Sequence, residues 1–303
     1  MRQEEKAFVV EKLQEYIDLH IDRPITLKQL SDVAGYSPGY VTLMFRDTVG
    51  RSPYDYIRAR RLTAAALALR DGDHRVLDIA LDFLFDSHEG FTRAFSKEFG
   101  ILPGEYKRST PAIRLFLPVK AHQSYRALHP DNSDKEEIMS NTSFKTIFAQ
   151  VIERPARKCL LKRGKTADGY FKCCEEAGCD VWNVLLSVKE ALYEPIGMWL
   201  PKHLIPAGTS EYVQGVELPL NYDKSIPAGY ELITLPPCTL MVFQGEPYDD
   251  EKFCEAIEEV WEHLETFKPE LYGYKWAPEA APSFQLAPIG SRGYIEARSV
   301  EKA

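Results

Sequence analysis

The sequence predicts a multidomain protein, with an all-α double helix-turn-helix domain followed by an α+β domain of two β-α-β-β repeats. Two observations support this fold class. Within the first 110 residues a block of helical periodicity recurs after 50 residues, and beyond residue 143 β-type and helical runs alternate in an order that occurs twice. The length of 303 residues fits about two domains, which we place at 1–110 and 143–303, with a linker at 111–142.

Composition limits the class of protein before any motif is considered. Hydrophobic residues make up 45% and charged residues 27% of the chain, as in ordinary globular proteins, so general disorder is excluded. The net charge is −8, and residues 1–110 carry 16 Lys and Arg against 17 Asp and Glu. Binding to nucleic acid would therefore depend on local clusters of positive charge, because the net charge does not favour it.

No run of 18 apolar residues is present, and the first six residues lead into an amphipathic pattern without a signal-peptide core. We expect a cytoplasmic protein with no membrane-spanning segment. All six cysteines follow residue 150, and in a reducing compartment they are expected to be free thiols. A metal or redox site at Cys173, Cys174 and Cys179 is the alternative, although no fourth ligand stands at a suitable spacing.

The internal repeat aligns residues 37–58 with residues 87–108 without a gap. Seven of these 22 positions are identical: Ser37 and Ser87, Thr42 and Thr92, Phe45 and Phe95, Gly50 and Gly100, Pro53 and Pro103, Tyr56 and Tyr106, Arg58 and Arg108. The serines are placed to cap a helix N-terminus, and the glycines to end the helix in the left-handed conformation. Apolar residues between them recur at helical spacing, which predicts one buried face on each helix.

A shorter amphipathic helix is predicted before each copy, at 27–34 and at 76–83. Helix, short turn and capped helix together form the helix-turn-helix pattern. Gly35 is a suitable turn residue in the first unit, whereas Leu84 stands at the matching place in the second and predicts a somewhat different turn. Two helical hairpins without a role in DNA binding are the alternative interpretation.

One long helix is predicted at 53–70, between the two units. It contains a basic cluster formed by Arg58, Arg60, Arg61 and Arg70. Such a cluster suits contact with DNA phosphates, and a solvated surface is the equally simple alternative.

Residues 5–108 resemble the DNA-binding domain of the AraC/XylS family of transcription regulators, most closely in the block 85–106, FDSHEGFTRAFSKEFGILPGEY. The resemblance implies a seven-helix module in which a linker helix holds two recognition helices about one DNA turn apart. One chain would then read two successive major grooves of double-stranded DNA.

By position in this family, the residues expected at base edges are Gly39, Thr42 and Leu43 in the first recognition helix and His88, Glu89, Gly90 and Arg93 in the second. The phosphate candidates are Arg46, Thr92 and Lys97, together with Ser37 and Ser87. Arg93 is the strongest candidate, because arginine on guanine is the commonest base-specific contact. Glu89 either accepts from cytosine or only fixes Arg93. Leu43 departs from the family, where a polar or basic residue is usual, so the first helix is expected to read thymine methyl groups and DNA shape.

The second domain is predicted from alternating patterns. Strands are expected at 144–152, 158–161, 212–219, 230–235, 239–244, 284–286 and 293–298, and helices at 169–192 and 249–267. The strands 230–235 and 239–244 are expected to pair across Pro236 and Pro237. The order of strand, helix and strands occurs at about 144–219 and again at 230–298, which predicts a duplicated α+β unit.

Glu296 lies in the middle of an otherwise apolar closing strand, in a domain that also holds all four tryptophans. Core packing is the default for any single aromatic residue. A carboxylate among aromatic rings suits a cationic, partly apolar ligand, and an exposed strand face is the alternative.

This half resembles the GyrI-like effector-binding domain, especially at 229–243 and in the strand that contains Glu296. The resemblance implies two repeats around a central cleft and a hydrophobic or cationic small-molecule effector, as in multidrug sensing. Tyr170, Trp199, Tyr212 and Trp276 are the further cleft candidates. Some domains of this kind hydrolyse small electrophiles and others bind proteins, so a hydrolase with Glu296 as general base and a protein-interaction module are the alternatives.

These observations together predict a sequence-specific DNA-binding transcription regulator, and not an enzyme, with double-stranded DNA and a small-molecule effector as partners. RNA polymerase is a further partner in the case of an activator. No cofactor and no metal are expected. The sequence identifies neither the effector nor the promoter.

Overall fold

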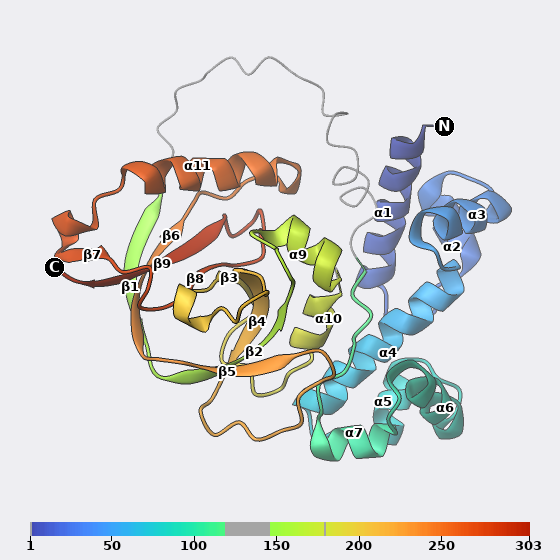
Figure 1. Cartoon of the computed structure of the whole chain (residues 1–303). Coiled ribbons are helices and arrows are strands. Elements are labelled where there is room, and N and C mark those ends of the chain that lie inside the picture. Colours follow the sequence, from blue (N-terminus) through green and yellow to red (C-terminus); the bar gives the residue numbers. More distant parts are fainter. Residues whose placement is uncertain (1, 119–145, 179) are drawn as a thin grey trace. The chain divides into compact units, whose positions relative to one another are not determined.

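The computed structural model describes residues 2–118, 146–178 and 180–303, which form two compact units (Figure 1). One unit contains residues 2–110 and 114–118, and the other contains Pro111–Ile113 and residues 146–303. Most of the predicted linker, Cys179 and the first residues of the predicted strand at 144–152 lie outside the described residues. No described helix combines the length and apolarity needed to cross a membrane.

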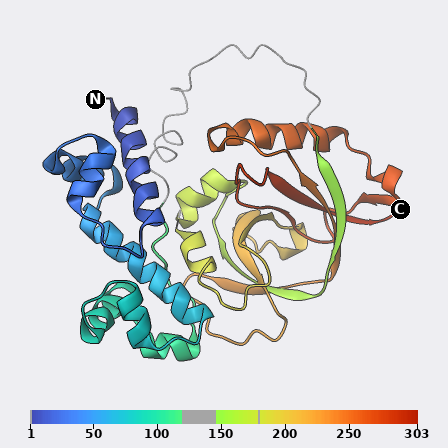
Figure 2. The same ribbon diagram turned by 180° about the vertical axis from the view of Figure 1, so that it is seen from behind.

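The described residues of the first unit form seven helices: α1 (Gln3–Leu19), α2 (Leu27–Ala34), α3 (Pro38–Val49), α4 (Pro53–Asp71), α5 (Val76–Asp82), α6 (His88–Phe99) and α7 (Pro103–Ser109). Helix α4 lies between the α1–α3 group and the α5–α7 group (Figures 1 and 2). Its buried residues, which include Tyr56, Leu62, Ala66 and Leu69, surround much of the helix because both groups pack on it. The predicted helix-turn-helix units and the long helix between them are confirmed.

The turns of the two helix-turn-helix units are closed by the same backbone hydrogen bond, so the difference predicted from Leu84 is limited to the residue that takes the left-handed conformation. In the first helix-turn-helix unit Gly35 adopts a φ of 72°, and the N–H of Tyr36 donates to the carbonyl of Ser31. In the second helix-turn-helix unit Leu84 takes the left-handed conformation with a φ of 61°, and the N–H of Phe85 donates to the carbonyl of Ala80. The same hydrogen bond therefore closes both turns, but the second turn requires a conformation that costs a non-glycine residue about 1 kcal/mol.

Tyr56 and Tyr106 occupy equivalent positions of the repeat, and both are buried. The phenol of Tyr56 is hydrogen-bonded to Gln14, and its ring meets Phe45 edge to face at 5.1 Å between centroids. The hydroxyl of Tyr106, in contrast, has no hydrogen-bond partner among the described residues. Burial raises the pKa of Tyr106 to about 12, so this hydroxyl stays protonated at neutral pH.

We expect Tyr106→Phe to increase the free energy of unfolding by about 1 kcal/mol, because a buried hydroxyl without a partner opposes folding. Tyr56→Phe is the matched control and is expected to decrease it, because that change removes a hydrogen bond to Gln14. Thermal unfolding of the full chain, followed by calorimetry, measures both. A loss of stability in Tyr106→Phe as large as in Tyr56→Phe would contradict the prediction.

The second unit is built on nine described strands: β1 (Phe148–Arg154), β2 (Arg157–Arg163), β3 (Ile196–Trp199), β4 (Tyr212–Leu218), β5 (Glu231–Leu235), β6 (Cys238–Gln244), β7 (Tyr274–Trp276), β8 (Ser283–Gln285) and β9 (Ile295–Lys302). They form one antiparallel sheet in the order β1-β6-β9-β8-β3-β4-β2-β5, with β7 paired to β9. Three helices accompany the sheet: α9 (Tyr170–Ala177), α10 (Val181–Leu185) and α11 (Phe253–Thr266).

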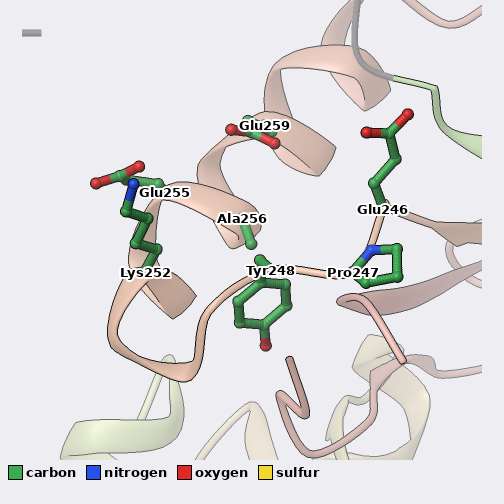
Figure 3. Close-up of a pocket in the computed structure, with 7 residues that line it drawn as sticks. All are labelled: Glu246, Pro247, Tyr248, Lys252, Glu255, Ala256 and Glu259. Atoms are coloured by element: carbon green, nitrogen blue, oxygen red, sulfur yellow. The ribbon is translucent and has the colours of Figure 1, made fainter. Parts of the chain in front are cut away.

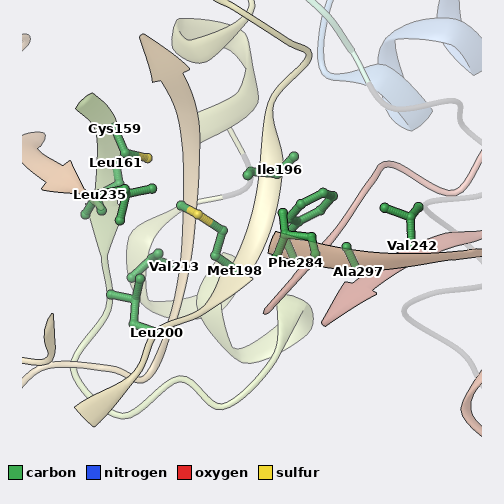
Figure 4. Packing of buried hydrophobic residues seen from close by; sticks show 11 residues of the cluster. Cys159, Leu161, Ile196, Met198, Leu200, Val213, Leu235, Val242, Phe284 and Ala297 are labelled. Atoms are coloured by element: carbon green, nitrogen blue, oxygen red, sulfur yellow. The ribbon is translucent and has the colours of Figure 1, made fainter. Parts of the chain in front are cut away.

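The two faces of this sheet differ in what covers them. One face carries a cluster formed by strand residues, among them Met198, Phe284 and Ala297 (Figure 4). Leu235 of β5 and Ile152 of β1, from opposite ends of the strand order, both join this cluster, so the sheet curves around it. On the other face, α9 and α10 pack near β4 and α11 packs near β6 and β9.

Two predictions for this unit are corrected, and two strands are added. The helix predicted at 169–192 is two helices, interrupted at Gly178, whose φ is 93°. Strands β3 and β7 were not expected, since they span only four and three residues. Strands β5 and β6 do not pair with each other, because β5 pairs with β2 and β6 pairs with β1 and β9. The physical reason is the Pro236-Pro237 link, since the favoured tight hairpin turns need a positive φ that proline cannot adopt.

Candidate functional site

The two recognition-type helices are built alike. The hydroxyl of Ser37 accepts a hydrogen bond from the N–H of Tyr40 in α3, and the hydroxyl of Ser87 accepts one from the N–H of Gly90 in α6. Gly50 and Gly100 end these helices with φ values of 76° and 73°. The predicted caps and helix ends are confirmed, and each helix therefore begins and ends at a fixed place.

One face of each helix is left exposed. On α3 it carries Gly39, Leu43 and Arg46, and on α6 it carries His88, Glu89, Arg93 and Lys97. The opposite face is buried through residues such as Phe45 and Phe95, so the exposed face is the only one of the two that can enter a groove. Of the remaining predicted residues, Thr42, Gly90 and Thr92 are partly buried, and the hydroxyl of Thr42 donates to the carbonyl of Pro38.

The guanidinium of Arg93 is exposed, and within the part of the chain that the structure describes no hydrogen bond or ion pair holds it. Glu89, one turn before it on α6, forms no ion pair with it there either. The interpretation in which Glu89 only fixes Arg93 therefore has no support in this geometry. Arg93 is available for a bidentate contact with a guanine.

Three of the four arginines in the basic cluster of α4 form ion pairs or hydrogen bonds within the first unit. Arg60 pairs with Asp18 at 2.7 Å, and Arg61 donates to the carbonyls of Ile21 and Arg23. Arg70 pairs with the neighbouring Asp71 at 2.7 Å. Arg58 is the exposed member of the four, so the hypothesis that the whole cluster meets phosphate is narrowed to this residue.

In the second unit, the register of the central strands places several predicted ligand residues on one face. Trp199 pairs with Tyr212, Gly197 with Gln285, and Gln285 in turn with Glu296. Side chains at paired positions point to the same side of a sheet, here the side on which the helices pack. Glu296 and Tyr212 are buried there, and the exposed strand face considered for Glu296 is excluded.

A chain of hydrogen bonds connects these side chains. The amide nitrogen of Gln285 donates to the hydroxyl of Tyr212, and the hydroxyl of Tyr294 lies 2.9 Å from the amide oxygen of Gln285. The same Tyr294 hydroxyl is 3.1 Å from Oε2 of Glu296, which also accepts from Nε1 of Trp261 at 2.6 Å. Burial raises the pKa of Tyr212 and Tyr294, so both phenols are uncharged hydrogen-bonding groups at neutral pH. A side chain at Gly197 would clash with the hydroxyl of Tyr212, at 1.9 Å from its Cβ, so this position requires glycine.

The carboxylate of Glu296 is not alone. Its Oε1 accepts from Nε of Arg298 at 3.1 Å, and the Arg298 side chain is 37% exposed. Glu296 itself is 3% exposed. In this structure the carboxylate of Glu296, which is predicted to bind a cationic ligand, is therefore already paired with the guanidinium of Arg298, and that side chain is partly exposed to solvent.

The structure brings together three of the five predicted ligand residues, Glu296, Tyr212 and Trp199, whose ring lies 5.1 Å from that of Tyr212. Tyr170 begins α9 and is 39% exposed. Trp276 packs with Phe243 and Phe267 in the cluster beneath α11, and Phe243 is the cross-strand partner of Glu296.

A pocket of about 70 Å³ lies at the start of α11 (Figure 3). It is lined by Glu246, Pro247, Tyr248, Lys252, Glu255, Ala256 and Glu259, none of which is a predicted ligand residue. Within the described residues, no three His, Cys, Asp or Glu side chains gather as a metal site would need, and Cys159, Cys173, Cys174, Cys238 and Cys254 are free thiols.

Known proteins resemble the first unit. Residues 30–109 match the model of a helix-turn-helix domain family. The regulatory protein SoxS of Salmonella typhimurium is 37% identical over 99 residues, which are 33% of this chain and 92% of SoxS. The chain belongs to the AraC/XylS family of transcription regulators.

Two further similarities have the same extent. The transcriptional regulator Rob of Salmonella typhimurium is 42% identical over 106 residues, which are 35% of this chain and only 37% of the length of Rob. The C-terminal domain of AraT, a response regulator from Geobacillus stearothermophilus, shares 27% identity over 33% of this chain and 84% of that domain, with a TM-score of 0.32. The matched parts amount to about a third of this AraC/XylS-family chain, and the family model covers no residue of the second unit.

Two members of the buried cluster have no signal in the sequence pattern of this family member, whereas a third, Arg298, has one. Gln285 reaches the cluster through strand pairing, and Trp261 through the packing of α11, neither of which has a local signal. Arg298 has a signal, because Tyr294, Glu296 and Arg298 alternate along one strand and must share a face. That alternation alone predicts that an arginine lies beside the buried carboxylate.

Proposed function

We propose that this AraC/XylS-family chain is a sequence-specific DNA-binding transcription regulator that reads double-stranded DNA with α3 and α6. The observation that carries this proposal is the pair of identically capped helices with exposed faces on either side of one continuous helix, α4. With 19 residues, α4 is about 28 Å long, close to the roughly 34 Å between successive major grooves on one side of DNA. Binding then depends on helix N-termini and on exposed residues such as Arg93, Lys97 and Arg46, because net charge does not favour DNA.

Selection of binding sites from a random-sequence duplex library, with the full chain, tests this proposal. We expect a bipartite site whose halves lie about 10 base pairs apart. The half read by α6 should be more strongly specified than the half read by α3, because α6 offers Arg93 and α3 offers Leu43. Failure to enrich any site, or enrichment of a single short motif without a fixed partner, would refute bipartite reading.

We further propose that the second unit binds a small effector with an apolar body and a positive charge, as the GyrI-like resemblance suggests. The strand order supports a duplicated β-α-β-β architecture, because exchanging β1 with β5, β2 with β6, β3 with β8 and β4 with β9 reproduces it in reverse. The middle of this arrangement is the β3–β8 pair, beside which Glu296, Tyr212 and Trp199 meet. Regulation by an effector, and contact with RNA polymerase, would follow from this arrangement in a transcription regulator.

The pairing of Glu296 with Arg298 makes a specific prediction about this effector site. A cationic ligand must compete with Arg298, so Arg298→Met should increase the affinity for a lipophilic cation such as tetraphenylphosphonium by about tenfold. Glu296→Gln should decrease it, because the carboxylate charge is lost while the shape is kept. Isothermal titration calorimetry of the full chain measures both changes. Equal affinities in the wild type and both variants would mean that this carboxylate does not bind the cation.

The hydrolase alternative is tested by the same variants. A general base must take a proton from the substrate or its water, and in Glu296 that proton would compete with the contacts from Trp261, Tyr294 and Arg298. Incubation with small electrophiles therefore should give no product. Turnover that disappears in Glu296→Gln would establish catalysis instead of sensing.

A further inference from the structure

The segment that follows the seven helices lies along α4. Residues 114–118 form no helix or strand, yet Leu115 is 1% exposed and Phe116 packs against the core of the first helix-turn-helix unit. Both backbone groups of Phe116 pair with Thr63 of α4. Its N–H donates to Oγ1 of Thr63 at 2.9 Å, and this hydroxyl lies 3.4 Å from the Phe116 carbonyl, which also accepts from Arg60 at 3.2 Å. Backbone groups that are satisfied in this way hold the segment in one place.

The ring of Phe116 contacts residues at the first helix-turn-helix unit, and one of them, Arg51, also contacts the second. It meets Tyr56 edge to face at 5.3 Å between centroids, and the guanidinium of Arg51 lies over it at 4.4 Å. Nη1 of Arg51 is 3.8 Å from a carboxylate oxygen of Glu98, which belongs to α6. Arg51 immediately follows the end of α3, so it contacts Phe116, stands beside the first recognition helix and reaches the second.

We propose that residues 114–118 are a clasp that belongs to the DNA-reading module and fixes the separation of α3 and α6. The inference rests on the proposed DNA binding. A tilt of about 5° at one end of the roughly 28 Å helix α4 moves its other end by about 2 Å, which exceeds the tolerance of a hydrogen bond to a base edge. The family model ends at residue 109, so the clasp lies outside the part of the chain that it matches. Phe116 and Thr63 are thus positioning residues, which act on DNA through α3 and α6.

The test uses the full chain and the duplex obtained by site selection, together with two derivatives. In one derivative the half-sites are moved one base pair further apart, and in the other only the α6 half-site remains. The variants are Phe116→Ala and Thr63→Val, which keeps the volume of Thr63 but removes the hydroxyl that pairs with Phe116. Thr63→Ser restores that hydroxyl, and Phe148→Ala makes the same change as Phe116→Ala at an exposed position of the second unit.

We expect altered spacing to weaken wild-type binding by about 30-fold or more, as expected when one of two half-site contacts is lost. In Phe116→Ala and Thr63→Val this penalty should fall below about fivefold, because a looser α3–α6 pair tolerates either spacing. Binding to the single half-site should change less than about twofold in every variant, since it needs only α6. Thr63→Ser and Phe148→Ala should behave as the wild type.

Hydrogen exchange at the Phe116 amide checks the clasp without DNA, with protection expected in the wild type and in Thr63→Ser and its loss in Thr63→Val. An unchanged spacing penalty in a variant that has lost this protection would overturn the clasp. Equal losses of affinity for the full bipartite site and for the single half-site would also overturn the clasp, because they indicate that the variant is misfolded. If Phe116→Ala fails to fold, the comparison of Thr63→Val with Thr63→Ser tests the clasp. A wild type that selects no bipartite site refutes the proposed bipartite reading of DNA, and that result appears before any variant is compared.

Discussion

Glu217→Leu is expected to lower the free energy of unfolding of the second unit by about 3–5 kcal/mol, because it leaves two buried arginines without a counter-charge. Glu217 of β4 is 1% exposed, and its carboxylate lies between Arg154 and Arg157. Nε of Arg157 is 2.6 Å from one oxygen, and Arg154 pairs with the other. A loss of this size is a large part of the stability of an ordinary domain.

The control for this prediction is Glu301→Leu, the same substitution in an exposed ion pair. Glu301 lies 3.1 Å from Lys275, and the two side chains are 57% and 54% exposed, so its removal should cost less than about 1 kcal/mol. Urea unfolding followed by circular dichroism compares the two variants. Replacing all three charged residues at once, by Met at Arg154 and Arg157 and Leu at Glu217, should recover most of the loss. The prediction is wrong if Glu217→Leu costs no more than Glu301→Leu.

The buried pair of Glu217 and Arg157 also links two turns, through the other hydrogen bonds of Arg157. Its Nη1 donates to the carbonyls of Pro155 and Pro236, at 3.2 and 3.1 Å. These prolines lie in the two links that replace hairpins, between β1 and β2 and between β5 and β6. One arginine therefore ties together two turns that are 81 residues apart at Pro155 and Pro236. Loss of the Glu217 carboxylate should loosen both links together.

The parts of the fold that the sequence predicts are those with local causes. Ser37, Ser87, Gly50 and Gly100 act on their own helices, so their caps and helix ends need no tertiary information. The pairing of β5 with β2, in contrast, depends on residues about 70 positions away, and neither strand indicates its partner.

The residues of the candidate sites also divide into those that a local pattern predicts and those that only strand pairing places. The exposed faces of α3 and α6 follow from helical periodicity, and the exposure of Arg93 agrees with the position predicted for it. The burial of Glu296 and its pairing with Arg298 are also within reach of strand alternation. Gln285 is not, because only the register of β8 against β9 places it opposite Glu296.

Arg93→Ala is expected to weaken binding to the selected duplex by about 10- to 100-fold, which corresponds to about 1–3 kcal/mol for one bidentate base contact. Binding to unrelated duplex DNA should persist, because phosphate contacts do not depend on base sequence. A second site selection with the variant should relax one base position in the half-site read by α6. Fluorescence anisotropy titrations and this selection measure the two effects.

Arg46→Ala provides the control, since Arg46 lies on the exposed face of α3 and is expected at phosphate. This change should weaken binding to every duplex by a similar factor and reduce the slope of log affinity against log salt by about 1. The two arginines thus separate the two components of binding, one that selects bases and one that holds the backbone. If Arg93→Ala also lowers affinity uniformly and leaves every base position as strongly specified as before, then Arg93 is a phosphate contact. The polar reading of bases would in that case fall to His88 and Glu89, the other exposed polar residues of the first turn of α6.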